Sequence, residues 1–151
     1  MKRPSQDKYF MSMAMLAATR SNCYRRQVGC VIIDKENRVL ATGYNGVPSG
    51  YPHCEIGECP RDKPGADLHL CLAIHAEQNA LLQCSDVDKI HKVYVTDSPC
   101  LTCTVMLMNT NCKQILYNKP YPGHETSKDA WKKLNRIWRQ YDFRSSTIIP
   151  N

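Results

Sequence analysis

Apolar and polar residues recur along the chain at two periods, and these periods predict an order of helices and strands. Apolar residues at helical spacing predict helices over residues 8–19, 73–84, 100–110 and 126–141. Short β-branched runs predict strands over residues 28–34, 38–43, 92–96, 114–117 and 143–149. Helices and strands alternate in this order, so we expect an α/β fold: a three-layer α/β/α sandwich with a five-stranded mixed sheet.

Two of the predicted helices have an apolar face that should be buried. In helix 8–19 this face consists of Phe10, Met13, Leu16 and Ala17. In helix 126–141 it consists of Trp131, Leu134, Trp138 and Tyr141, after a start at Thr126 and Asp129 that resembles a capping box. The first two strands, joined by a turn over 35–37, should pair as an antiparallel hairpin.

Composition restricts the class of protein further. The chain has 151 residues, of which 42% are hydrophobic, so we expect one domain with its own core over residues 1–151. No apolar run approaches the roughly 20 residues that span a bilayer, and the basic N-terminus lacks the apolar stretch of a secretory signal. Nine cysteines, an odd number, favour metal-bound or free thiols in a reducing cytoplasm over a disulfide framework.

The net charge of the chain suits an anionic partner. A formal charge of +6 is compatible with a nucleotide phosphate or with nucleic acid. The sequence has no sustained basic stripe with interleaved aromatic residues, the pattern that single-stranded nucleic acid requires. We therefore expect a small anionic ligand and neither a nucleic-acid nor a membrane partner.

Two short motifs indicate the chemistry. The first is His75-Ala76-Glu77, and the second is Pro99-Cys100-Leu101-Thr102-Cys103. One imidazole and two thiolates are a donor set that Zn²⁺ prefers, and three protein ligands leave a fourth position open, as in catalytic zinc sites. Glu77 lies two residues beyond His75, where it can reach a water at that position without binding the metal. H-x-E followed by P-C-x-x-C is typical of zinc-dependent nucleobase deaminases.

The predicted helices support this interpretation of the two motifs. His75 and Glu77 fall in the first turn of helix 73–84. Pro99 is a plausible first-turn residue of the next helix, with Asp97 and Ser98 as candidate caps. A helix N-terminus favours the thiolate form of a cysteine, which zinc requires. The alternative, two small buried cysteines and a core histidine, does not account for the joint occurrence of both motifs.

A second metal is a hypothesis for the long segment without periodicity, residues 44–72. A structureless segment of this length needs something to fix it, and a structural Zn²⁺ would do so. The preferred ligands are Cys23, Cys54, Cys59 and Cys71, with His69 as the substitute. The alternative is that these are surface or buried free cysteines.

Several further segments resemble the deoxycytidylate (dCMP) deaminase family. They are the run RSNC at 20–23, Val28-Gly29, the segment TGYNGVPSG at 42–50 followed by His53-Cys54, and HAEQNA at 75–80. The likeness covers about residues 8–149, and the run HAEQNA resembles that of bacterial and phage members of the family. It implies a cytidine deaminase-like fold and a cytoplasmic hexamer that hydrolyses dCMP to dUMP and ammonia, which supplies the precursor of dTMP. It also implies activation by dCTP and inhibition by dTTP at a separate site, with Mg²⁺ accompanying the triphosphate.

The resemblance also suggests roles for residues outside the two motifs. Asn45 is similar to the asparagine that binds the sugar, although it could equally form the turn at 44–46. Arg25 and Arg26 are candidates for the 5′-phosphate, or a solvated surface pair. Tyr121 is a candidate cover for the base, or simply an aromatic loop residue. The candidate effector loop, where backbone N–H groups can approach phosphate, contains Gly43, Asn45, Gly46 and Gly50.

In the predicted mechanism, zinc held by His75, Cys100 and Cys103 lowers the pKa of its water from about 15.7 toward about 7. Glu77 takes the proton of that water and passes protons to N3 and to the leaving amine of cytosine. Two alternatives remain. One is a deaminase for tRNA adenosine, single-stranded DNA or free cytidine, and the other is a non-enzymatic zinc module. The unligated Glu77 argues against the second, because a purely structural zinc site needs no such acid.

Overall fold

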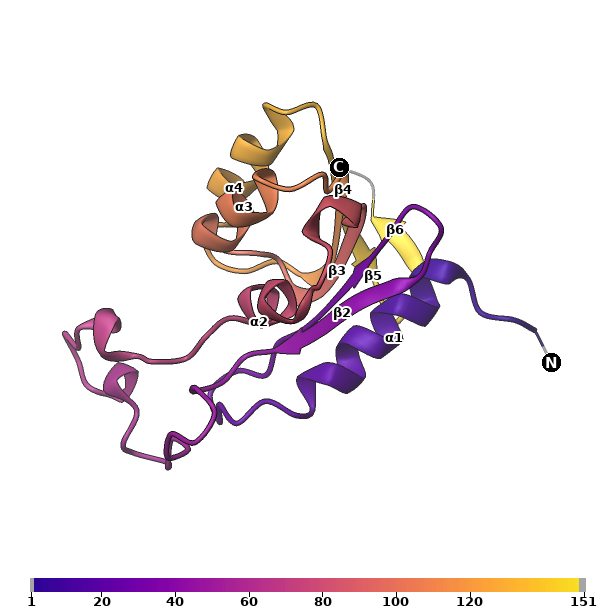
Figure 1. Ribbon diagram of the computed structural model, residues 1–151. Helices are drawn as coiled ribbons and strands as arrows, with labels where there is room; N and C mark the ends of the chain where they lie inside the picture. The colour runs from indigo at the N-terminus through magenta and orange to yellow at the C-terminus, as the bar shows by residue number, and fades with distance from the viewer. Residues whose placement is uncertain (1, 150–151) are drawn as a thin grey trace.

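Six strands form one mixed sheet in the computed structural model, which describes residues 2–149 (Figure 1). The strands are β1 (Gly29–Ile33), β2 (Val39–Tyr44), β3 (Lys92–Asp97), β4 (Gln114–Lys119), β5 (Ile137–Asp142) and β6 (Thr147–Ile149). The helices are α1 (Gln6–Ala18), α2 (Ala76–Gln83), α3 (Leu101–Met108) and α4 (His124–Lys132). The spatial order is β2-β1-β3-β4-β5-β6. The α/β sandwich with a mixed sheet is confirmed, but the expected number of five strands is wrong.

Pairing within the sheet changes direction at two places. β1 lies antiparallel to both β2 and β3, so the predicted hairpin is confirmed. β3, β4 and β5 are parallel, and β6 is antiparallel to β5. Because β3 and β4 are parallel neighbours, the segments that follow them leave the sheet at the same edge. Cys100 and Tyr121, which follow these two strands, are thereby placed near each other.

Helices cover both faces of the sheet. α1 lies on one face, and α2, α3 and α4 lie on the other (Figure 1). Alternate strand residues serve the two cores: Val31 and Ile33 pack with α1, whereas Cys30 and Ile32 pack on the opposite side. All four of these side chains are fully buried. Such continuous burial explains why β1 reads as an unbroken apolar run.

The expected helix over 126–141 is wrong in its second half. α4 ends at Lys132, and the chain turns through Asn135, whose φ of 55° lies in the left-handed region, before it enters β5. Trp138 and Tyr141 are buried as expected, but they lie on opposite faces of β5, each in a different core. A spacing of three residues matches one face of a helix and both faces of a strand, so the pattern alone could not distinguish them. Leu134 is 43% exposed.

The expected face of α1 is only partly right. Phe10 is buried with Met11, Ala14 and Ala18, whereas Leu16 is 71% exposed. The helix approaches the sheet through small residues. A Cβ on Gly29 would lie 1.9 Å from the Ala14 carbonyl oxygen, so β1 and the α1 backbone are in direct contact. That close approach sets the rotation of the helix, which hydrophobicity alone did not predict.

Contacts between α2 and β2 fix the start of α2. A Cβ on Gly43 would lie 2.2 Å from the Ala76 carbonyl oxygen, so strand and helix backbones touch. Asn79 donates its side-chain amide to the Tyr44 carbonyl at 2.7 Å, and Gly46 pairs with Ile74 in an isolated antiparallel bridge. The segment between Gly46 and Ile74, with short 3₁₀ turns at Pro60–Asp62 and Leu68–Leu70, extends away from the sheet (Figure 1). Within residues 2–149, no helix is both long and apolar enough to cross a membrane.

Candidate active site

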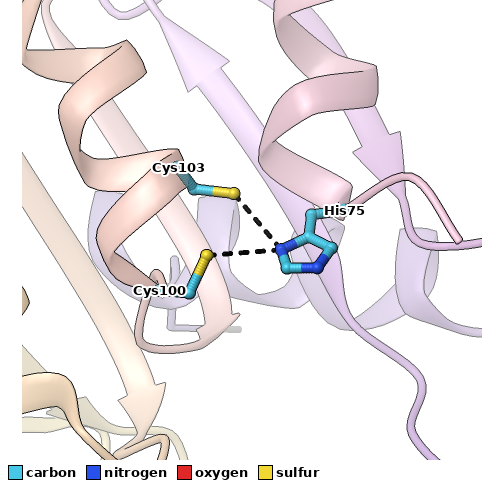
Figure 2. Close-up of side chains that lie close together, drawn as sticks. All are labelled: His75, Cys100 and Cys103. Atoms are coloured by element: carbon cyan, nitrogen blue, oxygen red, sulfur yellow. Dashed lines mark hydrogen bonds between the residues drawn. The ribbon is translucent and has the colours of Figure 1, made fainter. Parts of the chain in front are cut away.

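Three zinc-type donors converge where α2 and α3 begin (Figure 2). His75 is the N-cap of α2, Cys100 is the N-cap of α3, and Cys103 lies in the first turn of α3. The sulfurs of Cys100 and Cys103 are each 3.4 Å from Nδ1 of His75, and the three atoms lie within 4.8 Å of one another. The expected helix starts are therefore too early. His75 precedes its helix, and Cys100 caps the next one in place of Asp97 or Ser98.

The donor set fits Zn²⁺. Zinc bonds of about 2.3 Å to sulfur and about 2.0–2.1 Å to nitrogen, at tetrahedral angles, put S and N about 3.6 Å apart. The observed 3.4 Å is close to that separation, so the ion requires little movement of the side chains. Within residues 2–149, no other three His, Cys, Asp or Glu side chains have ligand atoms gathered this closely.

The three donors differ in how readily each loses its proton, which a zinc ligand must do. The pKa of Cys100 is lowered to about 4, first by its hydrogen bond with Cys103 and also by the one with His75. The pKa of Cys103 is raised, because its proton is shared with Cys100 and because it is buried. Hydrogen bonding to Cys100 raises the pKa of His75, while the positive charge of Arg61 opposes that rise. A first thiolate thus forms readily, and a cation is needed to stabilise the second.

Glu77 lies in the first turn of α2, beside the three donors. Only 4% of the residue is exposed, and burial raises the pKa of its carboxyl to about 7. This carboxyl can therefore both accept and release a proton near neutral pH. Glu77 and His75 line the same cavity, which we call the central cavity and which also includes Asn45, Cys100 and Tyr121 in its wall.

One wall of the central cavity is formed by a stacked pair from distant segments. The Arg26 guanidinium lies 4.5 Å from the centre of the Tyr121 ring and donates to Asp97 Oδ2 at 3.2 Å. Tyr121 is held in turn by its backbone N–H, which donates to Ser98 Oγ at 2.7 Å. Burial raises the pKa of Asp97, and the neighbouring Arg26 opposes that rise. Arg26 and Tyr121, named separately from the sequence, are thus neighbours.

The other two predicted substrate residues also line the central cavity, but each has partners of its own. The side-chain oxygen of Asn45 accepts from Val28 N–H at 2.7 Å, and its amide donates to the Arg26 carbonyl at 2.8 Å. Asn45 thereby fixes the segment that precedes β1. The Arg25 guanidinium forms an ion pair with Asp62, which also accepts from the Tyr24 hydroxyl.

The four cysteines predicted to bind a second zinc all line the central cavity: Cys23, Cys54, Cys59 and Cys71. Burial raises the pKa of Cys54, and the three other cysteines add to that rise, so the four lie near one another. Their sulfurs do not form a close set like that of His75, Cys100 and Cys103. The substitute His69 is exposed and does not line the cavity.

The candidate effector loop forms a second hollow, which we call the side cavity, with Tyr44, Gly46, Ser49, Gly50 and His53 in its wall. Gly46 and Gly50 line this cavity. Gly43 does not, because it is covered by α2, and Asn45 lines the central cavity instead. Among the described residues 2–149, no lysine or arginine lines the side cavity.

The structure adds residues to the site that the sequence did not indicate. Arg61 and Tyr24 line the central cavity, and Asp62 fixes the wall beside them. Arg61 lies in the segment without periodicity, where no motif marks it. Its position two residues after Cys59, one of the clustered cysteines, is the one feature of the sequence that could have indicated its place in the site.

An α/β/α sandwich that brings one histidine, a C-x-x-C pair and a buried glutamate together at two helix starts has the architecture of a zinc-dependent deaminase. Comparison with known proteins agrees. Residues 4–119 match the family model described as "Cytidine and deoxycytidylate deaminase zinc-binding region", and the chain therefore belongs to this family.

Relatives named deoxycytidylate deaminase include proteins from a yeast and a phage. The Saccharomyces cerevisiae protein is 44% identical over 97% of this chain and 48% of its own length. The Mycobacterium phage D29 protein is 40% identical over 79% of this chain and 98% of its own length. The chain thus spans about half the length of its yeast relative and nearly all of the phage one. The resemblance to deoxycytidylate deaminases is confirmed.

Solved structures show the same fold. The crystal structure of dCMP deaminase from the cyanophage S-TIM5, in complex with dCMP and dUMP, is 28% identical. It covers 93% of this chain and 99% of its own, with a TM-score of 0.74. Its apo form gives a TM-score of 0.71 at 27% identity.

Proposed function

We propose that this chain hydrolyses dCMP to dUMP and ammonia. The observation that carries the proposal is the buried Glu77 carboxyl beside three converging zinc donors, in one cavity, in a chain 40–47% identical to relatives named deoxycytidylate deaminase. The cyanophage neighbour that binds dCMP and dUMP supports this choice of substrate and product. A free nucleotide also agrees with the net charge of +6.

The residues divide into metal ligands and a proton carrier. His75, Cys100 and Cys103 would hold Zn²⁺, which when bound supplies a Lewis acid that makes water reactive near neutral pH. In the reaction, a C4–O bond forms, the C4–N bond breaks, and two protons move from water to the base and the leaving ammonia. Glu77 takes these two protons one after the other, and passes the first to N3 and the second to the leaving amine. Its pKa of about 7 suits both transfers.

The remaining wall of the central cavity would hold the rest of the nucleotide. Asn45 retains hydrogen-bonding capacity beyond its two backbone contacts and is proposed to bind the sugar. Tyr121, fixed by Arg26 and Ser98, would cover the base. Arg25 and Arg26 would contribute positive charge near the phosphate, although each already has a carboxylate partner.

Three further properties are proposed from family resemblance together with the structure. Regulation by dCTP and dTTP would use the side cavity around Gly46 and Gly50. Because no lysine or arginine in the described part of the chain lines that cavity, a triphosphate there would need Mg²⁺ or residues of a neighbouring subunit, which agrees with a hexamer. Nine free cysteines suit a reducing compartment such as the cytoplasm.

A second, structural zinc is proposed for Cys23, Cys54, Cys59 and Cys71, with His69 as substitute. Its support is that all four cysteines line the central cavity and that the other three act on the charge of Cys54. Metal analysis tests it. Wild-type protein should contain two zinc ions per chain and Cys54→Ser close to one, whereas an unchanged zinc content in the variant would refute this ligand set.

The activity is tested by comparing substrates. The ultraviolet spectrum changes as cytosine becomes uracil, so turnover of dCMP, deoxycytidine and a cytosine-containing oligonucleotide can be followed directly. The proposal predicts that dCMP is much the best substrate. Equal turnover of the oligonucleotide would support the alternative of a nucleic-acid deaminase, and no turnover of any of the three would support a non-enzymatic zinc module.

A further inference from the structure

The central cavity contains three arginines, and they differ in how their charge is used. Arg25 is paired with Asp62, and Arg26 is paired with Asp97 at 3.2 Å. Arg61 also lines the cavity, but within residues 2–149 it forms no ion pair with a carboxylate. Its charge is therefore available to an anion entering the cavity.

The segment that carries Arg61 is fastened at the next residue. Asp62 accepts hydrogen bonds from the Tyr24 hydroxyl and from the Arg25 guanidinium, and Arg25 also donates to the Arg61 carbonyl at 3.4 Å. These contacts join the short turn Pro60–Asp62 to the segment before β1. The Arg61 carbonyl and the Asp62 side chain are thus held by the segment before β1, while the Arg61 side chain forms no hydrogen bond or ion pair with any residue of the range 2–149.

From this arrangement we infer that Arg61 binds the 5′-phosphate of the nucleotide, and that Asp62 is a positioning residue for it. A guanidinium presents a planar fork of donors that matches phosphate oxygens. Arg25, a sequence-based candidate for the same task, contributes its charge nearby and anchors the turn through Asp62. This inference rests on the proposed function. It goes further because it names the residue by which the enzyme would distinguish a nucleotide substrate from a nucleoside.

The test measures kcat and KM of the zinc-loaded enzyme with dCMP and with deoxycytidine, for wild type, Arg61→Ala and Arg61→Lys. Arg61→Ala should lower kcat/KM for dCMP by about 10- to 100-fold, mainly through KM, because phosphate binding contributes equally to ground and transition states. Its kcat/KM for deoxycytidine should stay within about twofold of wild type. Arg61→Lys should recover part of the loss, since it keeps the charge without the fork.

Lys63→Ala is the matched control. Lys63 is exposed, lies two residues further along the same segment and carries the same charge, but it does not line the central cavity. It should leave both substrates unaffected. Asp62→Asn should raise KM for dCMP and leave kcat nearly unchanged, as expected of a residue that acts through Arg61.

Equilibrium binding of the products gives a second readout that does not depend on turnover. The dissociation constant of Arg61→Ala should rise about 10- to 100-fold for dUMP and hardly change for deoxyuridine. Equal dUMP binding and equal dCMP kinetics for Arg61→Ala and Lys63→Ala would overturn the role of Arg61. A wild-type enzyme that turns over no dCMP would instead refute the proposed function, so the two failures are distinguishable.

Discussion

Replacing Gly43 by alanine tests how the site is held in place. Gly43 lies in β2 against the first turn of α2, which follows His75 and contains Glu77. A Cβ there would lie 2.2 Å from the Ala76 carbonyl oxygen and 2.5 Å from the Ala80 nitrogen. Non-bonded contacts begin near about 3.5 Å, so α2 would have to retreat by roughly 1 Å. Overpacking costs about 1–3 kcal/mol, and a backbone clash that no side-chain rotation can relieve belongs at the upper end.

A loss of about 3 kcal/mol should lower Tm by about 6–12 °C in a chain of this size. The assay is thermal unfolding without nucleotide, at one protein concentration, for wild type, Gly43→Ala and Gly50→Ala. Gly50 is the control because its φ is +80° and a Cβ there meets nothing within 4 Å, so alanine costs only about 1 kcal/mol of backbone strain. If Gly43→Ala melted within about 2 °C of wild type, the close packing of α2 on β2 would be refuted.

Three further predictions concern the site itself. Glu77→Gln should keep its zinc and lose about 10²- to 10⁴-fold in kcat for dCMP, measured by steady-state kinetics beside metal analysis; near-normal turnover would remove Glu77 from the chemistry. In metal-free protein the native state keeps a proton on Glu77 up to a pKa of about 7, whereas the unfolded chain releases it near 4.5. The unfolding free energy of wild type relative to Glu77→Gln should therefore fall as pH rises between these values, by up to about 3 kcal/mol in urea titrations; a difference independent of pH would contradict the burial argument. Cys103→Ser should lose zinc and turnover together, while Cys84→Ser, outside the site, should keep both; retained zinc in the Cys103 variant would refute its role as a ligand.

The residues at the centre of the candidate site could be selected from the sequence because they lie in short motifs at helix starts, and the structure brings them together. His75, Glu77, Cys100 and Cys103 are close in sequence to the elements that hold them, so local spacing carried most of the information. The exact caps were less predictable. Cys100 caps α3 itself, one residue after Pro99, because backbone hydrogen bonding and not the preceding polar residues sets the helix start.

The wall of the central cavity could not be predicted in the same way. Arg61 reaches it because Asp62 pairs with Arg25, a contact between residues that are 37 positions apart in the sequence. No periodicity marks such a contact. Trp138 and Tyr141 of β5 are spaced as on one face of a helix, but they pack on opposite faces of the strand, both of which are covered. Only the tertiary structure distinguishes the two cases.

The most direct test of the account is the rate of dUMP formation from dCMP by the purified, zinc-loaded protein, before and after chelation. The account predicts turnover that chelation abolishes and added Zn²⁺ restores. A zinc-loaded protein that left the amino group of dCMP in place, with dCTP present or absent, would contradict it.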